Sequence, residues 1–208
     1  MAVAMKKQVF YIHGGESYTN YEDFLYDLNN EDIGDPLKEA SQRWKNRLRV
    51  DLPEYEVFTP SMPNKQNAKY TEWKIWFERH FFHLHDNLIL IGGSLGGMFL
   101  AKYLIENEPP FHIKALFMVG APWPENIRTN DSREDGGDFA SDTTKVEELA
   151  RKASKIYIFH SKDDSIVPYE HALKYKEALP EAELMSFEDK NHFLIPEFPE
   201  LIEKVKSL

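Results

Sequence analysis

The segment LILIGGSLGG, at residues 88–97, most constrains what this chain can fold into. Its first four residues are apolar throughout, which is typical of a strand buried on both faces of a parallel sheet. Glycines then surround Ser94, and a helical pattern begins directly after them. A strand that turns into a helix at one residue holds that residue in a strained conformation. The segment therefore predicts a sharp strand–serine–helix turn that lifts the serine hydroxyl above the edge of a sheet.

Short apolar runs alternate with helical patterns along the rest of the chain. The predicted strands are Gln8–Ile12, Glu56–Thr59, Asn87–Ile91, Ile113–Val119, Ile156–Phe159 and Ala182–Phe187. This alternation indicates an α/β fold, with a mainly parallel sheet of about six strands and helices on both faces. We expect one domain over residues 1–208, without a large lid.

Helical patterns lie between these strands. One helix is expected to begin with Asp35 as N-cap and Pro36 at its first position, and to place Trp44 on its apolar face. Further helices are expected after residue 71, behind a capping box at residues 144–147, and after residues 168 and 199.

Two polar stretches, residues 18–35 and 123–142, interrupt this pattern. We expect them to be loops or short cap elements over the carboxyl ends of the strands, where open α/β sheets bind ligands.

Composition excludes several classes of function. The chain has 35 Asp and Glu residues against 25 Lys and Arg, a net charge of −10, which argues against a nucleic-acid partner. It has no cysteine, so thiol nucleophiles, disulfides and Cys-ligated zinc are excluded. His80, His83 and His85 are mixed in spacing, so we expect a solvated surface and no metal site. No apolar run is long enough for a signal peptide or a membrane span, so we expect a cytoplasmic protein without a membrane partner.

The serine has two other interpretations: a small filler residue in a glycine-rich turn, or part of a nucleotide-binding loop, whose glycine order and lysine are missing here. A nucleophilic serine needs a base and a group that orients the base. Asp164 follows the fifth predicted strand and His192 follows the sixth, in the chain order serine, acid, histidine that a triad on this kind of parallel sheet is expected to have. Taken singly, Asp164 also fits a helix N-cap and His192 an ordinary loop residue.

With these residues the chain resembles the α/β-hydrolase superfamily, and within it the small serine hydrolases typified by retinoblastoma-binding protein 9 and its bacterial relatives. The resemblance rests on YIHGG, MPN, IGGSLGG, SKDDSIVP and NHF. It implies Ser94 as nucleophile, Asp164 as triad acid and His192 as base. It also implies an oxyanion hole from the Leu95 N–H and one N–H of the loop at residues 13–16, for which we choose Gly15 over Glu16.

The expected activity is the hydrolysis of small carboxylic esters through an acyl-enzyme, with a small-molecule acyl ester as substrate and no cofactor. The alternatives are an amidase, a thioesterase or an acyltransferase with the same triad, or a protein-binding member of the fold without catalysis. Asp163 competes with Asp164 for the acid position, although the spacing to Pro168 favours Asp164. We expect Trp123 and Phe193 to contact substrate; alternatively, Trp123 packs under its loop and Phe193 anchors the histidine loop.

Overall fold

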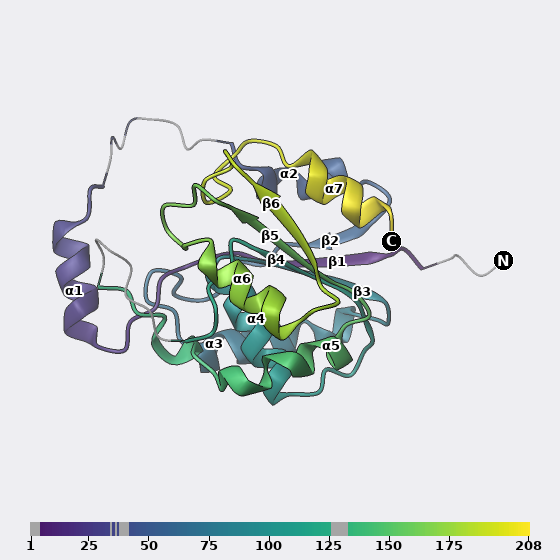
Figure 1. The fold of residues 1–208 in the computed structure, drawn as a ribbon, viewed down its shortest axis with the longest axis horizontal. Helices are drawn as coiled ribbons and strands as arrows, with labels where there is room; N and C mark the ends of the chain where they lie inside the picture. Colours follow the sequence, from purple (N-terminus) through teal and green to yellow (C-terminus); the bar gives the residue numbers. More distant parts are fainter. Residues whose placement is uncertain (1–4, 34, 36, 38–41, 126–132) are drawn as a thin grey trace.

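The fold is built on one six-stranded sheet in which every pair of neighbouring strands is parallel (Figure 1). The computed structural model describes residues 5–33, 35, 37, 42–125 and 133–208. The strand order is β2-β1-β3-β4-β5-β6. The strands are β1 (Gln8–Ile12), β2 (Glu56–Phe58), β3 (Leu88–Gly93), β4 (Ile113–Val119), β5 (Ile156–Ser161) and β6 (Glu183–Phe187). The expected α/β class and parallel sheet are thus confirmed.

The order of strands explains where a site can form. β1 lies between β2 and β3, so the chain reverses its direction of travel across the sheet after β2. Parallel strands all end at the same edge, and in open α/β sheets the carboxyl edge next to such a reversal is where ligands bind. The segments that follow β1, β3, β5 and β6 all leave the sheet at that edge.

Helices cover both faces of the sheet (Figure 1). One apolar cluster joins the sheet to the helices on one face. Its helical residues include Trp73, Phe99, Leu149 and Tyr175. A second cluster joins the opposite face to Leu48 and Val205. The helices of the first face are α3 (Tyr70–Arg79), α4 (Leu95–Glu106), α5 (Leu149–Lys152) and α6 (Glu170–Ala178), and those of the second are α2 (Trp44–Asp51) and α7 (Pro199–Lys206).

Helix α1 (Tyr21–Asn30) stands apart from these layers, beyond the carboxyl ends of the strands (Figure 1). The Asn20 side chain accepts the Glu22 N–H and so caps its first turn. The backbone N–H of Arg133 donates to the buried Asp27 carboxylate at 2.7 Å, and the Arg133 guanidinium pairs with Asp23 at 3.0 Å. Residues 18–33 therefore form a cap element that contains a helix rather than a plain loop.

Two helix starts differ from the expectation. The helix expected from Pro36 begins at Trp44, with Arg43 as N-cap; Pro36 itself lies outside the described residues, and Leu37 is 91% exposed. The Trp44 N–H donates to Ile195 O at 3.0 Å, so a contact with the C-terminal loop fixes this helix start.

The expected capping box at residues 144–147 is also wrong. These residues form the 3₁₀ helix η3 (Thr143–Glu148), and the Asp142 side chain caps it by accepting the Thr144 N–H at 3.1 Å. Two further 3₁₀ turns are η1 (Phe81–His83) and η2 (Gly137–Phe139).

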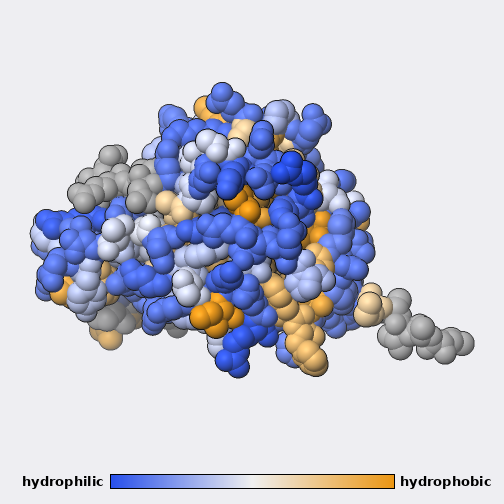
Figure 2. All heavy atoms as spheres, turned by 90° about the horizontal axis from the view of Figure 1, so that it is seen from below, coloured by the Kyte–Doolittle hydropathy of each residue, from blue (hydrophilic) through white to orange (hydrophobic). Residues whose placement is uncertain are grey.

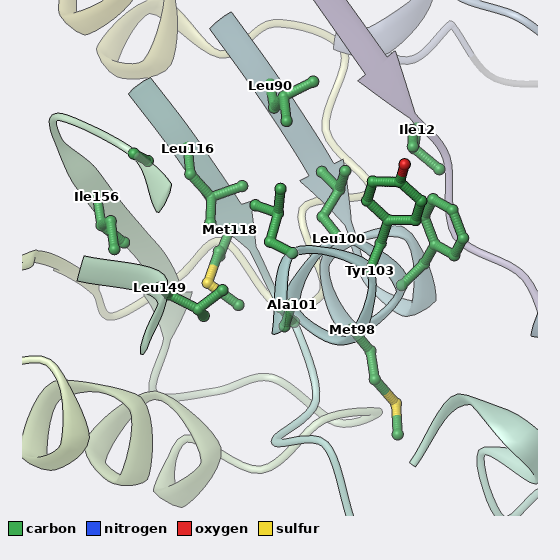
Figure 3. Packing of buried hydrophobic residues seen from close by; sticks show 14 of the residues in the cluster. Ile12, Leu90, Met98, Leu100, Ala101, Tyr103, Leu116, Met118, Leu149 and Ile156 are labelled. Carbon is green, nitrogen blue, oxygen red and sulfur yellow. The ribbon is translucent and has the colours of Figure 1, made fainter. Parts of the chain in front are cut away.

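The surface and the interior divide as expected for a chain of this composition. On the face drawn in Figure 2, hydrophilic residues predominate and hydrophobic ones form small separate spots. Buried residues such as Leu90, Leu100 and Leu116 pack between the sheet and α4 (Figure 3). None of the helices in the described part of the chain is long and apolar enough to cross a membrane.

Candidate active site

The turn between β3 and α4 holds Ser94 in a strained conformation. Ser94 has φ +51° and ψ −126°, and its N–H donates to Val119 O at 2.8 Å. A Cβ at Gly92 would stand 2.6 Å from the Gly96 carbonyl oxygen, and one at Gly96 would stand 2.3 Å from the Ile12 carbonyl oxygen. The backbones therefore approach too closely for side chains at these positions, which explains the glycines on both sides of Ser94.

Asp164 and His192 meet above the carboxyl edge of β5 and β6. The His192 Nδ1 lies 2.8 Å from Asp164 Oδ2 and 3.1 Å from Oδ1. The N–H groups of Ile166 and Val167 each donate to Asp164 Oδ1 at 2.9 Å. Burial raises the pKa of the Asp164 carboxyl, but the hydrogen bond and charge of His192 and these backbone donors outweigh it, so the pKa is lowered. The carboxylate thus stays ionised and keeps Nδ1 of His192 protonated.

Asp163 has a different place. Its Oδ1 accepts the Ser161 hydroxyl at 2.5 Å and the Asn191 N–H at 2.9 Å. It therefore ties the end of β5 to the loop that carries His192 and does not bond to the imidazole. Of the two neighbouring acids, the structure brings Asp164 to His192.

Ser94 and His192 line one large cavity of about 730 Å³. A Cβ at Gly120 would stand 3.3 Å from His192 Nδ1 and 3.5 Å from Asp164 Oδ2, so the imidazole and the carboxylate lie beside the end of β4 as well. Within the described residues the Ser94 hydroxyl makes no hydrogen bond. In enzymes without bound substrate such hydrogen bonds are often long and tighten only in the complex.

The two amides considered from the sequence in the loop after β1 differ in their hydrogen bonds. The Glu16 N–H donates to Lys65 O at 2.8 Å and is therefore occupied. The Gly15 N–H and the Leu95 N–H make no hydrogen bond within the described part of the chain, and both residues line cavities that Ser94 also lines. Of these two amides, the Gly15 N–H is therefore the one without a hydrogen bond among the described residues.

His13 holds the peptide group between Gly14 and Gly15. The Met62 N–H donates to His13 Nε2 at 2.8 Å, so Nδ1 carries the proton and donates to Gly14 O at 2.6 Å. In a trans peptide the carbonyl and the N–H point in opposite directions, so fixing Gly14 O directs the Gly15 N–H away from His13. Burial lowers the pKa of His13 more than the Gly14 carbonyl raises it, which keeps this imidazole neutral.

The two residues expected to contact substrate have different places. Phe193 lines the large cavity and also stacks on Phe198, with ring centroids 5.0 Å apart. Trp123 lines neither the large cavity nor the smaller one beside it; its ring packs edge-on against Tyr175 at 4.9 Å. This position favours the alternative given for Trp123, in which its indole packs under its loop and into the core.

Sequence reasoning missed two aromatic residues of the large cavity. Tyr11 is buried on β1, and its hydroxyl would stand 3.0 Å from a Cβ at Gly93, directly before Ser94. Trp44 lines the cavity and donates its indole N–H to Phe193 O at 3.0 Å. In the sequence both residues belong to apolar patterns, and no local motif marks either as a wall of the cavity.

Glu134 lines the cavity from the cap side. Burial, with the Glu16 carboxylate nearby, raises the pKa of Glu134 to about 8. Near neutral pH this side chain is therefore a neutral carboxylic acid. Among the described residues, no group of three or more His, Asp or Glu side chains is arranged to hold a metal ion.

The chain matches known sequences over most of its length. A family model described as serine hydrolase matches residues 38–200. The serine hydrolase RBBP9 of Rattus norvegicus is 26% identical over 175 residues, which cover 84% of this chain and 89% of the rat protein.

Solved structures show the same fold. The ydeN gene product of B. subtilis covers 97% of both chains at 20% identity, with a TM-score of 0.70. Est1E of Butyrivibrio proteoclasticus, solved with ferulic acid, covers 99% of this chain and 89% of its own at 15% identity, with a TM-score of 0.60. A meta-cleavage product hydrolase of Pseudomonas fluorescens covers 99% and 91% at 14% identity, with a TM-score of 0.64. The chain has an α/β-hydrolase fold and belongs to the serine hydrolase family.

Proposed function

We propose that the protein hydrolyses small carboxylic esters through an acyl-enzyme on Ser94, with His192 as the base and Asp164 as the acid that orients it. One observation carries the proposal: the 2.8 Å contact between His192 Nδ1 and Asp164 Oδ2, at a cavity that Ser94 and His192 both line. A buried carboxylate that holds Nδ1–H leaves Nε2 as the basic nitrogen, which is the tautomer that proton abstraction from a serine requires.

In the acylation step, the Ser94 Oγ attacks the ester carbonyl while His192 Nε2 takes its proton. Negative charge develops on the carbonyl oxygen, where the N–H groups of Leu95 and Gly15 donate to it. The C–O bond to the alcohol then breaks, and the leaving oxygen takes the proton from the imidazolium. Asp164 stabilises that imidazolium without becoming protonated itself.

In the deacylation step, water takes the place of the alcohol. His192 abstracts a proton from the water, which attacks the acyl carbon, and the same two amides hold the oxyanion. The bond to Ser94 Oγ breaks, and the proton returns to the serine. The products are a carboxylic acid and free enzyme, so atoms and charge balance over the cycle.

The form of the large cavity supports a small-molecule substrate. Its walls carry Arg43 and Lys45 on one segment and Glu31 and Asp32 on another, with aromatic side chains near Ser94. Such mixed walls suit a neutral or zwitterionic ester better than a long lipid chain. The esterase-like names among the structural neighbours agree with an ester substrate, and we extend the proposed hydrolase domain over the whole chain.

A panel of p-nitrophenyl acyl esters, run against the wild type and Ser94→Ala, tests the proposal. We expect turnover by the wild type and none above the uncatalysed rate by the variant. Ser165→Ala is the matched control, because Ser165 also lines the cavity but lies outside the elbow. Turnover that survives in Ser94→Ala and disappears in the control would overturn the assignment of the nucleophile.

The same panel includes p-nitroanilides and acyl thioesters with the same acyl groups. Esters are expected to give the highest kcat/KM after correction for their uncatalysed rates. If the thioesters or anilides exceed the esters after this correction, the triad stands and the reaction class proposed here does not.

A further inference from the structure

A second, smaller cavity also has Ser94 in its wall. Its volume is about 40 Å³, and it lies between the elbow, the end of β4 and the start of α6. We call this space the recess. Its apolar side chains are Leu95, Met98, Pro122, Ile166, Val167 and Pro168.

The position of His192 decides which half of an ester enters the recess. His192 lines the large cavity and not the recess, whereas Ser94 lines both. The imidazole must protonate the leaving oxygen, so the alcohol has to lie on the His192 side. The remaining substituent on the carbonyl carbon, the acyl group, then extends from Ser94 to the opposite side, into the recess.

The volume of the recess limits the acyl group. Each water-sized group needs about 10–15 Å³ of such a cavity. The 40 Å³ of the recess therefore holds about three non-hydrogen atoms beyond the carbonyl carbon. Met98 limits the depth of this space: it is almost fully buried, and a Cβ at Gly136 would stand 3.3 Å from its Cε. Figure 3 shows the Met98 side chain extending from α4 away from the sheet.

One wall of the recess carries a buried polar group that the proposed reaction does not use. His171 lines the recess and is 6% exposed. Its Nδ1 accepts the Trp123 N–H at 2.8 Å, so the proton of the neutral ring lies on Nε2. Within the described residues, no hydrogen bond joins Nε2 to another group. Among the described residues, Nε2 is not one of the side-chain atoms that are buried without a partner, so this donor faces the open space of the recess, where a ligand oxygen can accept its proton in place of water.

Charge at the recess is low near neutral pH. Burial lowers the pKa of His171 to about 4, so the ring is neutral, and Glu134, which also lines the recess, stays protonated below about pH 8. The remaining acid, Glu125, pairs with Lys174. These walls favour a neutral acyl group over a charged one.

We propose that the recess is the acyl subsite of the protein, that it accepts neutral acyl groups with up to about three non-hydrogen atoms beyond the carbonyl carbon, and that His171 Nε2–H donates to an oxygen within that group. The proposal rests on the function proposed above. It names short oxygen-bearing acyl groups, such as alkoxyacetyl or hydroxyacyl groups, as the preferred class.

Acyl chain length tests the size of the subsite. With p-nitrophenol as the fixed leaving group, kcat/KM of the wild type is expected to fall at least about tenfold from butyrate to hexanoate, because the longer chain overfills the recess. Met98→Ala deepens the recess and is expected to reduce that ratio to about threefold or less. Met185→Ala is the matched control, since Met185 lines neither cavity, and its ratio should equal that of the wild type.

A pair of isosteric esters tests the donor. p-Nitrophenyl methoxyacetate and butyrate differ by one oxygen in place of a methylene group. After division by their alkaline hydrolysis rates, methoxyacetate is expected to have the higher kcat/KM by about tenfold in the wild type. His171→Leu should abolish this preference, and His171→Gln, which keeps a donor, should retain part of it.

The outcomes separate this proposal from the proposed function. If the wild type turns over esters but shows no fall from butyrate to hexanoate, the recess is not the acyl subsite. If kcat/KM falls from butyrate to hexanoate but the corrected kcat/KM values of methoxyacetate and butyrate are equal, the proposed role of His171 is wrong. The assignment of the recess as the acyl subsite then still stands. The wild-type measurements need no variant, so they decide even if Met98→Ala fails to fold. If the wild type turns over no ester of either series, the proposed function fails and this inference with it.

Discussion

The elbow at Ser94 and the cap that faces it are built by different means. At the elbow, backbone contacts hold the turn: the Ser94 N–H donates to Val119 O at 2.8 Å, and the glycines on both sides allow the backbones to touch. The cap depends on side chains, such as the pair of Arg133 with Asp23 and the bond from the Thr19 N–H to Asp135 at 2.9 Å. Because exposed ion pairs contribute little free energy, the cap can change without disturbing the elbow.

This difference has a functional meaning. Reacting groups must be held within a fraction of an ångström, which backbone contacts achieve best. Walls that select among substrates need only the right size and polarity. Substitutions at the elbow and its partners should therefore reduce kcat strongly, whereas substitutions in the cap should change KM or the pH profile and leave most of kcat intact.

Among the residues around Ser94, the largest effect is expected at Asp164. Replacing it by Asn keeps the shape but favours the wrong tautomer of His192, so kcat should fall about 10⁴-fold with the best ester. Steady-state kinetics measures this. Asp163→Asn is the matched control, because Asp163 bonds to the loop and not to the imidazole, and its loss should stay within about tenfold. Equal losses in both variants would contradict the assignment.

A smaller effect is expected at His13. His13→Leu removes the bond to Gly14 O that directs the Gly15 N–H, so kcat should fall by about 10- to 100-fold with little change in KM. His83→Leu makes the same exchange at an exposed histidine far from the cavities and should leave both constants unchanged. A loss confined to KM would mean that His13 supports substrate binding rather than the oxyanion.

Breaking the cap should cost less again. Arg133→Gln removes the ion pair with Asp23, and we expect kcat/KM to change by less than about threefold because the pair is exposed. A larger fall in kcat, with KM unchanged, would show that the cap positions the reacting groups and would remove the distinction drawn above.

An effect of similar size is expected from the ionisation of Glu134. Glu134 ionises at about pH 8, and its negative charge would then oppose the oxyanion beside Ser94. The ratio of kcat/KM for Glu134→Gln over wild type should therefore rise about two- to fivefold between pH 7 and pH 9. Glu16, Asp27 and Asp135 also surround this carboxyl and do not change in the variant.

The same group links stability to pH. The folded-state pKa of Glu134 lies above its unfolded value of 4.5, so the unfolded chain loses this proton first and stability falls as pH rises from about 4.5 to 8. Glu134→Gln should raise Tm relative to wild type at pH 9 and have little effect at pH 4. A Tm difference that is the same at both pH values would contradict the raised pKa.

The sequence predicted the sheet well because its signals are local. The bounds of β1 and β4 match the expected ranges, and β3 extends two residues further, through Gly93. The predicted start of α2 was wrong. The helix begins at Trp44, whose N–H donates to Ile195 O far along the chain, and no local helix signal at Pro36 reveals that contact.

The candidate site divides in the same way. Ser94, Asp164 and His192 stand out in the sequence because each directly follows a strand or forms the elbow. Tyr11, Trp44 and His171 do not, because their places at the cavities arise from packing between distant segments. His171 stands three residues after Pro168 in an ordinary helical pattern. Its role as a donor follows only from the structure, where the Trp123 N–H donates to Nδ1 and so leaves the ring proton on Nε2.

The most direct test of the central claim is covalent labelling by a fluorophosphonate, with the modified peptide located by mass spectrometry. Only a serine activated by a correctly oriented imidazole reacts quickly with such a probe. We predict one adduct, on Ser94, that forms in the wild type and is at least about 10³-fold slower in His192→Ala. An adduct on another residue, or labelling of Ser94 at the same rate without the imidazole, would contradict the account.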